Sequence, residues 1–152
     1  MSPLPSSRRH SGGFSMIEVL VALLVFSLGV LGLVAIQATA TRMAGDARDR
    51  AVATFLADQL IARMLIADPA TANSFAHHPT GTTACNPSGA ASTNATVTAW
   101  LAEVTAQLPK ATSALQQIVI TAGNEVTVRL CWQNGEEPPR SLTVRNQVQW
   151  QL

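Results

Sequence analysis

The sequence contains no tyrosine, and phenylalanine and tryptophan together bring its aromatic content to only 5%. Proteins that bind single-stranded nucleic acid stack the bases on aromatic side chains, so this chain offers little for that kind of binding. Charged residues are also scarce, at 12% of the chain against about 25% in an average soluble protein. Because the formal net charge is only +1, no strong attraction to nucleic acid or anionic lipid follows.

The few charged residues are unevenly distributed along the chain. Residues 14–41 contain one ionisable side chain, Glu18, and the stretch Val19–Ile36 contains one polar side chain, Ser27. A bilayer core about 30 Å thick needs about 20 apolar residues in a helix. Residues 14–41 are therefore long and apolar enough to form a transmembrane helix.

The helical pattern continues beyond this apolar segment. Apolar residues recur at steps of three and four, which predicts a helix with one apolar stripe. The stripe consists of Val52, Phe55, Leu56, Leu60 and Met64. Asp46 and Arg50 are spaced for an ion pair on its polar side. The first clear stop is Asp68-Pro69, so we expect one helix from about Phe14 to about Ile66, roughly 80 Å long.

The remainder of the chain predicts a loop, a short helix and a sheet. Residues 69–102 contain no Asp, Glu, Lys or Arg and are expected to form mostly a long loop, with a short helix at 97–108. Three later segments alternate between apolar and polar residues: 117–121, 125–132 and 142–152. One-sided alternation predicts an antiparallel sheet with one buried face, which the second half of the long helix can cover. The expected fold class is α+β, a long N-terminal α-helix packed on a C-terminal antiparallel β-sheet.

Cysteine is limited to Cys85 and Cys131. Two cysteines are too few for a disulfide-dense mini-protein but sufficient for one bridge in an oxidising compartment. Alternation places Cys131 on the outward face of its strand, where a bridge to Cys85 would hold the uncharged loop across the sheet. The alternative is two free thiols, and the compartment decides between the two.

A distinctive junction precedes the apolar segment. The residues Gly12-Gly13-Phe14-Ser15-Met16-Ile17-Glu18 follow a short leader that contains Arg8 and Arg9, and an unbroken apolar run comes after them. A glycine, an aromatic residue and a carboxylate at this spacing resemble the class III signal of type IV pilins and pseudopilins. The wider apolar run is most similar to the minor pilins of that family. The resemblance is specific from about Gly12 to Thr41 and only architectural beyond.

The resemblance implies proteolytic processing and a role for the carboxylate. Prepilin peptidase would cut between Gly13 and Phe14, remove the leader 1–13 and methylate the new N-terminus at Phe14. Glu18 would be the acidic residue of the family, which pairs with the α-ammonium of an adjacent subunit and sets the axial register. In a bundle of packed helices such a pair is poorly screened, and a carboxylate in an apolar segment is costly without a partner.

The same resemblance implies a location and partners. Residues 14–41 would form a transmembrane and fibre-core helix in the bacterial inner membrane, with a cytoplasmic N-terminus. Residues 42–152 would form a periplasmic globular domain, with a loop at 69–96 and a sheet within 116–152. The subunit would assemble with other minor pilins and the major pilin at the inner-membrane assembly platform, and so take part in twitching motility and adhesion. A major pilin usually has a proline in the first half of this helix, which is absent here.

Several alternatives remain open from the sequence. The nearest is a minor pseudopilin of a type II secretion system. Ala38-Thr39-Ala40 fits the cleavage site of an ordinary secretory signal, although the apolar run exceeds the ~7–15 residues of such signals. A signal-anchored periplasmic enzyme or binding module is a different class. Glu18 by itself is also explained as an interfacial carboxylate that a helix N-terminus favours.

No catalytic or metal-binding pattern stands out. The chain has no G-x-S-x-G, no phosphate-binding glycine loop and no H-E-x-x-H, so we expect no enzyme, no cofactor and no metal. His77 and His78 match no common zinc spacing with Cys85 and are expected to be solvated in a flexible loop. Asn94-Ala95-Thr96 fits a glycosylation acceptor but is interpreted as ordinary loop sequence. The tryptophans are expected in or beside the core: Trp100, Trp132 and Trp150.

Overall fold

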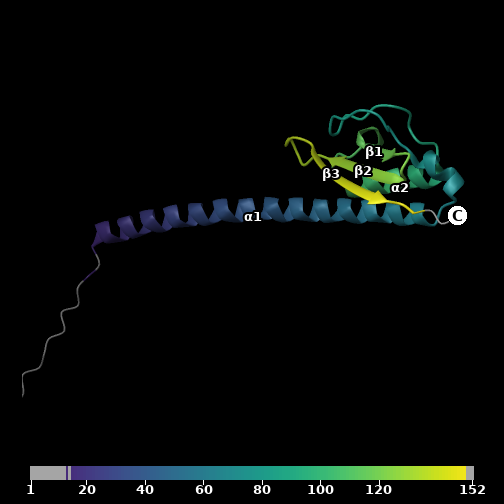
Figure 1. Cartoon of the computed structure of the whole chain (residues 1–152). Coiled ribbons are helices and arrows are strands. Elements are labelled where there is room, and N and C mark those ends of the chain that lie inside the picture. Colours follow the sequence, from purple (N-terminus) through teal and green to yellow (C-terminus); the bar gives the residue numbers. More distant parts are fainter. Residues whose placement is uncertain (1–12, 14, 150–152) are drawn as a thin grey trace, which may run out of the picture. The chain divides into compact units, whose positions relative to one another are not determined.

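The computed structural model describes residue 13 and residues 15–149 of the chain. Phe14, the leader residues 1–12 and the C-terminal residues 150–152 lie outside the described residues, and with them the expectations on Phe14 and Trp150. The elements follow the order α1 (Met16–Leu65), η1 (Pro69–Phe75), α2 (Ala95–Gln107), η2 (Ser113–Leu115), β1 (Gln117–Ile120), β2 (Glu125–Trp132) and β3 (Arg140–Gln147) (Figure 1). The fold class is α+β, as predicted: a long apolar N-terminal helix is followed by a small antiparallel three-stranded sheet.

The helix α1 contributes to both of the compact units into which the chain divides, Met1–Ala44 and Gly45–Leu152. It ends at Leu65, close to the predicted stop. The Asp68 side chain then accepts a hydrogen bond from the Ala70 N–H at 2.9 Å and so begins η1. A carboxylate at this position satisfies one of the backbone donors that a helix start leaves unpaired.

In the second unit α1 buries one face, and this face differs from the predicted stripe. The buried residues are Ala53, Leu56, Ala57, Leu60, Ile61 and Met64. Phe55 was predicted on the same face but is 62% exposed. At 100° per residue it lies about 170° from the middle of the buried set. The buried face runs through two alanines instead, whose small side chains admit close neighbours.

The sheet has the strand order β1-β2-β3, and both pairs are antiparallel. Val128 pairs with Ile118 on one side and with Val144 on the other. The even-numbered residues of β2 are buried, as the alternation predicted: Val126, Val128, Leu130 and Trp132. The third strand was predicted at 142–152, but in the structure it begins at Arg140 and ends at Gln147. Val148 is nevertheless fully buried, and its N–H donates to Asn124 O at 2.9 Å.

The helix α2 closes the core against α1, and Figure 1 shows it with the sheet over the second-unit part of α1. The buried Trp100 Nε1 donates to the backbone oxygen of Leu56 at 2.8 Å. Nearer the surface, Arg63 pairs with Glu103 at 2.9 Å. Asn94 begins α2 by accepting a hydrogen bond from the Thr96 N–H, so the apparent glycosylation acceptor serves here as a helix cap. The core positions predicted for Trp100 and Trp132 are confirmed.

The uncharged segment between η1 and α2 is more ordered than the predicted long loop. Thr80 and Ser88 exchange two backbone hydrogen bonds, at 2.9 and 2.8 Å. The backbone of His77 pairs with Ile118 on the free edge of β1. The expectation that this histidine is solvated is wrong, since only 3% of it is exposed. Backbone partners on distant segments hold it inside.

Candidate functional site

The candidate processing site stands immediately before α1. Gly13 is exposed, and a side chain built on it would meet no atom within 4 Å. Nothing in the described chain therefore requires glycine here for packing. The backbone oxygen of Ser15 accepts hydrogen bonds from the N–H groups of Glu18, at 3.0 Å, and Val19, at 3.3 Å. Glu18 thus lies in the first turn of α1, where the helix dipole favours a negative charge.

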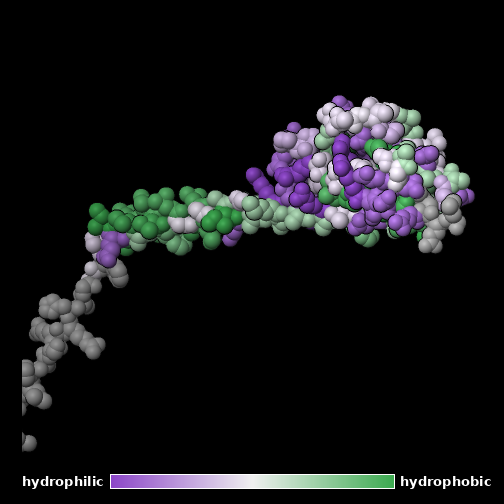
Figure 2. Space-filling model, viewed as in Figure 1, coloured by the Kyte–Doolittle hydropathy of each residue, from purple (hydrophilic) through white to green (hydrophobic). Residues whose placement is uncertain are grey.

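The first part of α1 exposes apolar side chains on every side. All residues from Ser15 to Gly45 are exposed, and the most apolar window of the helix has a mean hydropathy of 3.0 with none of it buried. Figure 2 shows one face of this part, which is largely hydrophobic. The helix is long and apolar enough to cross a bilayer. A helix that is hydrophobic all round needs lipid or other helices around it.

The hydroxyl groups of Ser27, Thr39 and Thr41 are satisfied within this apolar helix. Each hydroxyl group donates to the backbone oxygen four residues earlier, at 2.7–3.1 Å. Unsatisfied polar groups are costly in hydrocarbon, so these internal bonds suit a membrane segment. Glu18 is the one side chain of residues 14–41 that carries a charge.

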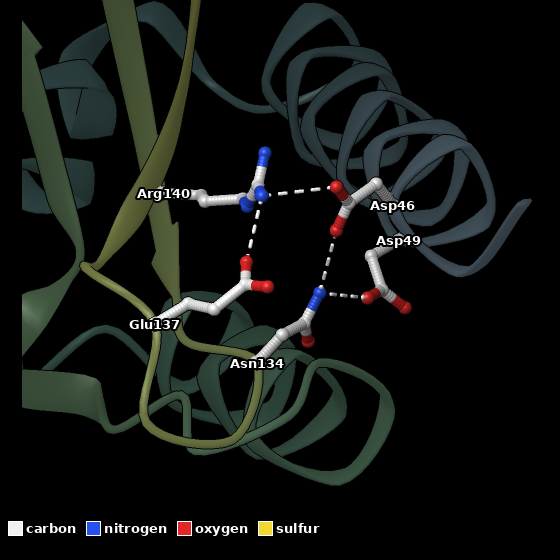
Figure 3. A network of polar contacts seen from close by, with 5 residues as sticks. All are labelled: Asp46, Asp49, Asn134, Glu137 and Arg140. Atoms are coloured by element: carbon white, nitrogen blue, oxygen red, sulfur yellow. Dashed lines mark hydrogen bonds and ion pairs between the residues drawn. The ribbon is translucent and has the colours of Figure 1, made fainter. Parts of the chain in front are cut away.

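A polar network connects α1 to the β2–β3 turn at the start of the second unit (Figure 3). Asn134 Nδ2 donates to Asp46 at 3.0 Å and to Asp49 at 2.9 Å. Arg140 Nη2 donates to Glu137 at 2.8 Å and to Asp46 at 2.9 Å. The hydrogen bond to Glu137 and the charge of Asp46 raise the pKa of the Arg140 guanidinium above its ordinary value. The network fixes the turn to the helix.

This network corrects one expectation from the sequence. Asp46 was predicted to pair with Arg50 one helical turn away, but among the described residues its partners are Asn134 and Arg140. Asn134 is followed by Gly135, a pair typical of a turn. No local pattern could have revealed its contact with α1, because the two lie on segments far apart in the chain.

The structure brings the two cysteines together. Cys85 and Cys131 form a disulfide with a Cα–Cα distance of 5.5 Å. Cys131 is fully buried, and its backbone N–H and oxygen bond to the side-chain amide of Gln116 at 2.8 and 3.0 Å. Neither sulfur is therefore a free metal ligand. Both ring nitrogens of His77 are likewise occupied, by Ser92 N and Ser113 O.

A family model described as the prokaryotic N-terminal methylation motif matches residues 8–34. No curated protein and no solved structure matches the chain. The matched segment includes Gly13, Phe14 and Glu18, and the α+β architecture is consistent with the type IV pilin-like fold. Proteins with this motif are structural subunits rather than enzymes, and the apolar helix fits membrane anchoring. The motif indicates a type IV pilin-like or pseudopilin-like precursor, processed by prepilin peptidase and assembled with pilus or secretion components.

Proposed function

We propose that this chain is a minor pilin similar to PilV. In this proposal it is cut after Gly13, methylated at Phe14 and incorporated into a type IV pilus or its tip. There it helps to initiate assembly with other minor pilins, and so contributes to twitching motility and adhesion. Before assembly, its N-terminus lies in the cytoplasm and the unit Gly45–Leu152 lies in the periplasm, held by the helix in the inner membrane.

The observation that carries the proposal is the combination of a methylation motif with a helix that is apolar all round. Residues 8–34 match the motif, and every described residue from Ser15 to Gly45 is exposed. A bilayer satisfies such a surface in the precursor, and neighbouring helices satisfy it in a fibre. A helix of this kind therefore suits a subunit that moves from membrane to fibre.

A second apolar surface lies on the part of α1 in the globular unit. Exposed residues recur there at coiled-coil spacing, opposite the buried face, and all but one of them are apolar: Ala51, Phe55, Asp58, Ala62 and Leu65. Phe55 is 62% exposed and Leu65 is 50% exposed. Apolar side chains at this spacing favour contact with another helix. This surface supports assembly with other subunits.

Processing is tested by the intact mass of the protein extracted from membranes. We expect loss of Met1–Gly13 and the addition of one methyl group at Phe14. The matched control is the same protein from cells that lack prepilin peptidase, which should retain the leader. A mature chain that begins at Thr41 would instead show that an ordinary secretory signal is present, and would refute the proposal.

Assembly is tested at Glu18, whose proposed partner is the α-ammonium of a neighbouring subunit. Glu18→Gln keeps the shape of the side chain and loses its charge, so incorporation should fall while cleavage and membrane insertion persist. The measurement is the amount of the subunit in sheared pili relative to the membrane pool. Glu125→Gln, which removes an exposed carboxylate from the start of β2, is the matched control. If Glu18→Gln were incorporated as well as the wild-type subunit, Glu18 would have no role in assembly and would be only an interfacial carboxylate.

The methylation motif is equally compatible with a minor pseudopilin of a type II secretion system. Deletion of the chain separates the two functions. Loss of surface pili and twitching with normal secretion supports the pilus. A secretion defect with normal pili supports the pseudopilin.

A further inference from the structure

His77 is a buried titratable side chain placed where three segments meet. It lies two residues after the end of η1, near the beginning of the segment 76–94 that leads to α2. Its N–H donates to Ile118 O at 3.1 Å, and its backbone oxygen accepts from Ile118 N at 2.9 Å. These two bonds hold the start of the segment against the free edge of β1.

The ring of His77 holds the end of the same segment. Its Nδ1 accepts a hydrogen bond from the backbone N–H of Ser92 at 3.0 Å. Because a backbone N–H is always a donor, Nδ1 carries no proton. The proton of the neutral ring is therefore on Nε2, which donates to Ser113 O in η2 at 2.9 Å. The two contacts together require a neutral imidazole in this one tautomer.

Among the described residues, no carboxylate faces the ring to stabilise a positive charge on it. The cavity of about 370 Å³ beside His77 is otherwise lined only by uncharged residues. These are Ala91, Ser92, Thr98, Leu101, Ala102, Thr105 and Ser113. Neither η1, η2 nor β1 contains a charged residue, and the charged residue of α2, Glu103, pairs with Arg63. Within the described part of the segment 76–94, His78 is the other titratable group.

Burial and the neighbouring His78 both lower the pKa of the His77 ring. Burial lowers the pKa of His77, the backbone hydrogen bond to Ser113 raises it in part, and the charge of His78 lowers it further. The two histidine rings lie 4.2 Å apart between centroids. A proton added at Nδ1 would also face the Ser92 N–H, so a donor would oppose a donor at 3.0 Å.

We propose that His77 is an acid-sensitive latch, in which protonation of Nδ1 breaks the bond to the Ser92 N–H and loosens the end of the segment 76–94. The start of the segment stays on β1, because Gln117 Nε2 donates to the backbone oxygens of His78, Thr80 and Gly81 at 3.0–3.1 Å. The Cys85–Cys131 disulfide keeps the loosened segment attached to β2. Opening at Ser92 changes the surface that the globular unit presents, so this surface responds to external pH. Only this biological consequence depends on the proposed periplasmic or fibre location; the chemistry of the latch does not.

The size of the effect follows from proton linkage. In the open segment the ring titrates near the ordinary histidine value of about 6.5. The opening equilibrium constant then rises up to tenfold per pH unit below that value, until the closed form also binds the proton. Between pH 7.5 and pH 5.0 we expect an increase of at most about 30-fold.

Hydrogen exchange of the full chain in detergent micelles, corrected for intrinsic rates, measures this opening. Peptides that contain the amide of Ser92 should lose protection between pH 7.5 and 5.0, up to the stated factor, while peptides from β1 and from β2–β3 keep theirs. His77→Gln retains a donor and an acceptor without titrating, and should abolish the pH dependence. His78→Gln is the matched control and should preserve it.

Two outcomes would overturn the latch: the same pH dependence in His77→Gln, or none in the wild type. If His77→Gln does not fold, ring nitrogen NMR of the wild-type chain keeps the proposal testable. Nδ1 should be unprotonated at pH 7.5, and its titration should coincide with loss of Ser92 amide protection. Titration without that loss would refute the proposal, whatever the result of the processing experiment.

Discussion

Removal of the disulfide between Cys85 and Cys131 should lower the free energy of unfolding by about 4 kcal/mol. The two cysteines are separated by 46 residues in sequence. In the chain-entropy model, closing a loop of this length lowers the entropy of the unfolded chain. At 25 °C this loss corresponds to about 4 kcal/mol of stabilisation. The loop encloses α2, η2 and β1, so its closure restricts much of the globular unit before folding. The variant Cys85→Ala/Cys131→Ala removes the constraint and leaves small apolar side chains.

The assay is urea unfolding of the full chain in detergent, followed by tryptophan fluorescence, since the indole of Trp100 is buried. The slope of the free energy with urea should also increase, because the unfolded chain without the bridge exposes more surface. Reduction of the wild-type protein is the control and should give the same loss as the double variant. A loss below about 1 kcal/mol would refute the loop-entropy reasoning. Recovery of alkylated Cys85 and Cys131 from unreduced protein would show that the bridge does not form.

Two further predictions concern the core and the pH dependence of stability. Leu56→Ala removes a fully buried side chain and should lower the free energy of unfolding by about 2–5 kcal/mol. Phe55→Ala should change it by less than about 0.5 kcal/mol yet reduce the amount of subunit in sheared pili; equal destabilisation of the two would contradict the assigned helix face. Since burial depresses the pKa of His77 in the folded chain, its stabilising contribution should be complete above about pH 6.5 and decrease as the pH falls below that value. Urea unfolding of wild type and His77→Gln at several pH values measures this, and parallel pH profiles would contradict it.

Regular alternation and unbroken apolar sequence made much of the fold predictable. The bounds of β2 agree with the prediction, because its four inward residues are all strongly apolar and both turns contain glycine. The long helix was equally clear from the absence of proline between Phe14 and Asp68. Phe55 was placed on the wrong face because alanine was not counted as a core residue, although Ala53 and Ala57 are fully buried. A prediction based on large side chains alone therefore assigned the wrong buried face to this helix.

Contacts between distant segments were not predictable from the sequence. His77 looked like a polar residue in a flexible loop, and its burial depends on backbone groups of Ser92 and Ser113 that no local pattern connects with it. Asp46 had a plausible partner one turn away, but the tertiary fold offers it Arg140 and Asn134 instead. The processing motif, in contrast, can be recognised without knowledge of the tertiary structure. Its information is local, because a peptidase reads a short linear segment, and so the amino-acid sequence alone is sufficient to recognise it.

The position of the disulfide determines how the globular unit responds to mechanical tension. α1 precedes Cys85 and β3 follows Cys131, so a force that pulls on the helix and on the end of the chain passes through the sulfur atoms. The residues between the cysteines would span about 150 Å if fully extended. The covalent bond prevents this segment from extending under force. In a stretched subunit, α2 and β1 therefore carry no tension, and the tension acts on the segments outside the bridge. Reduction would convert this short, stiff element into one that lengthens under the same force.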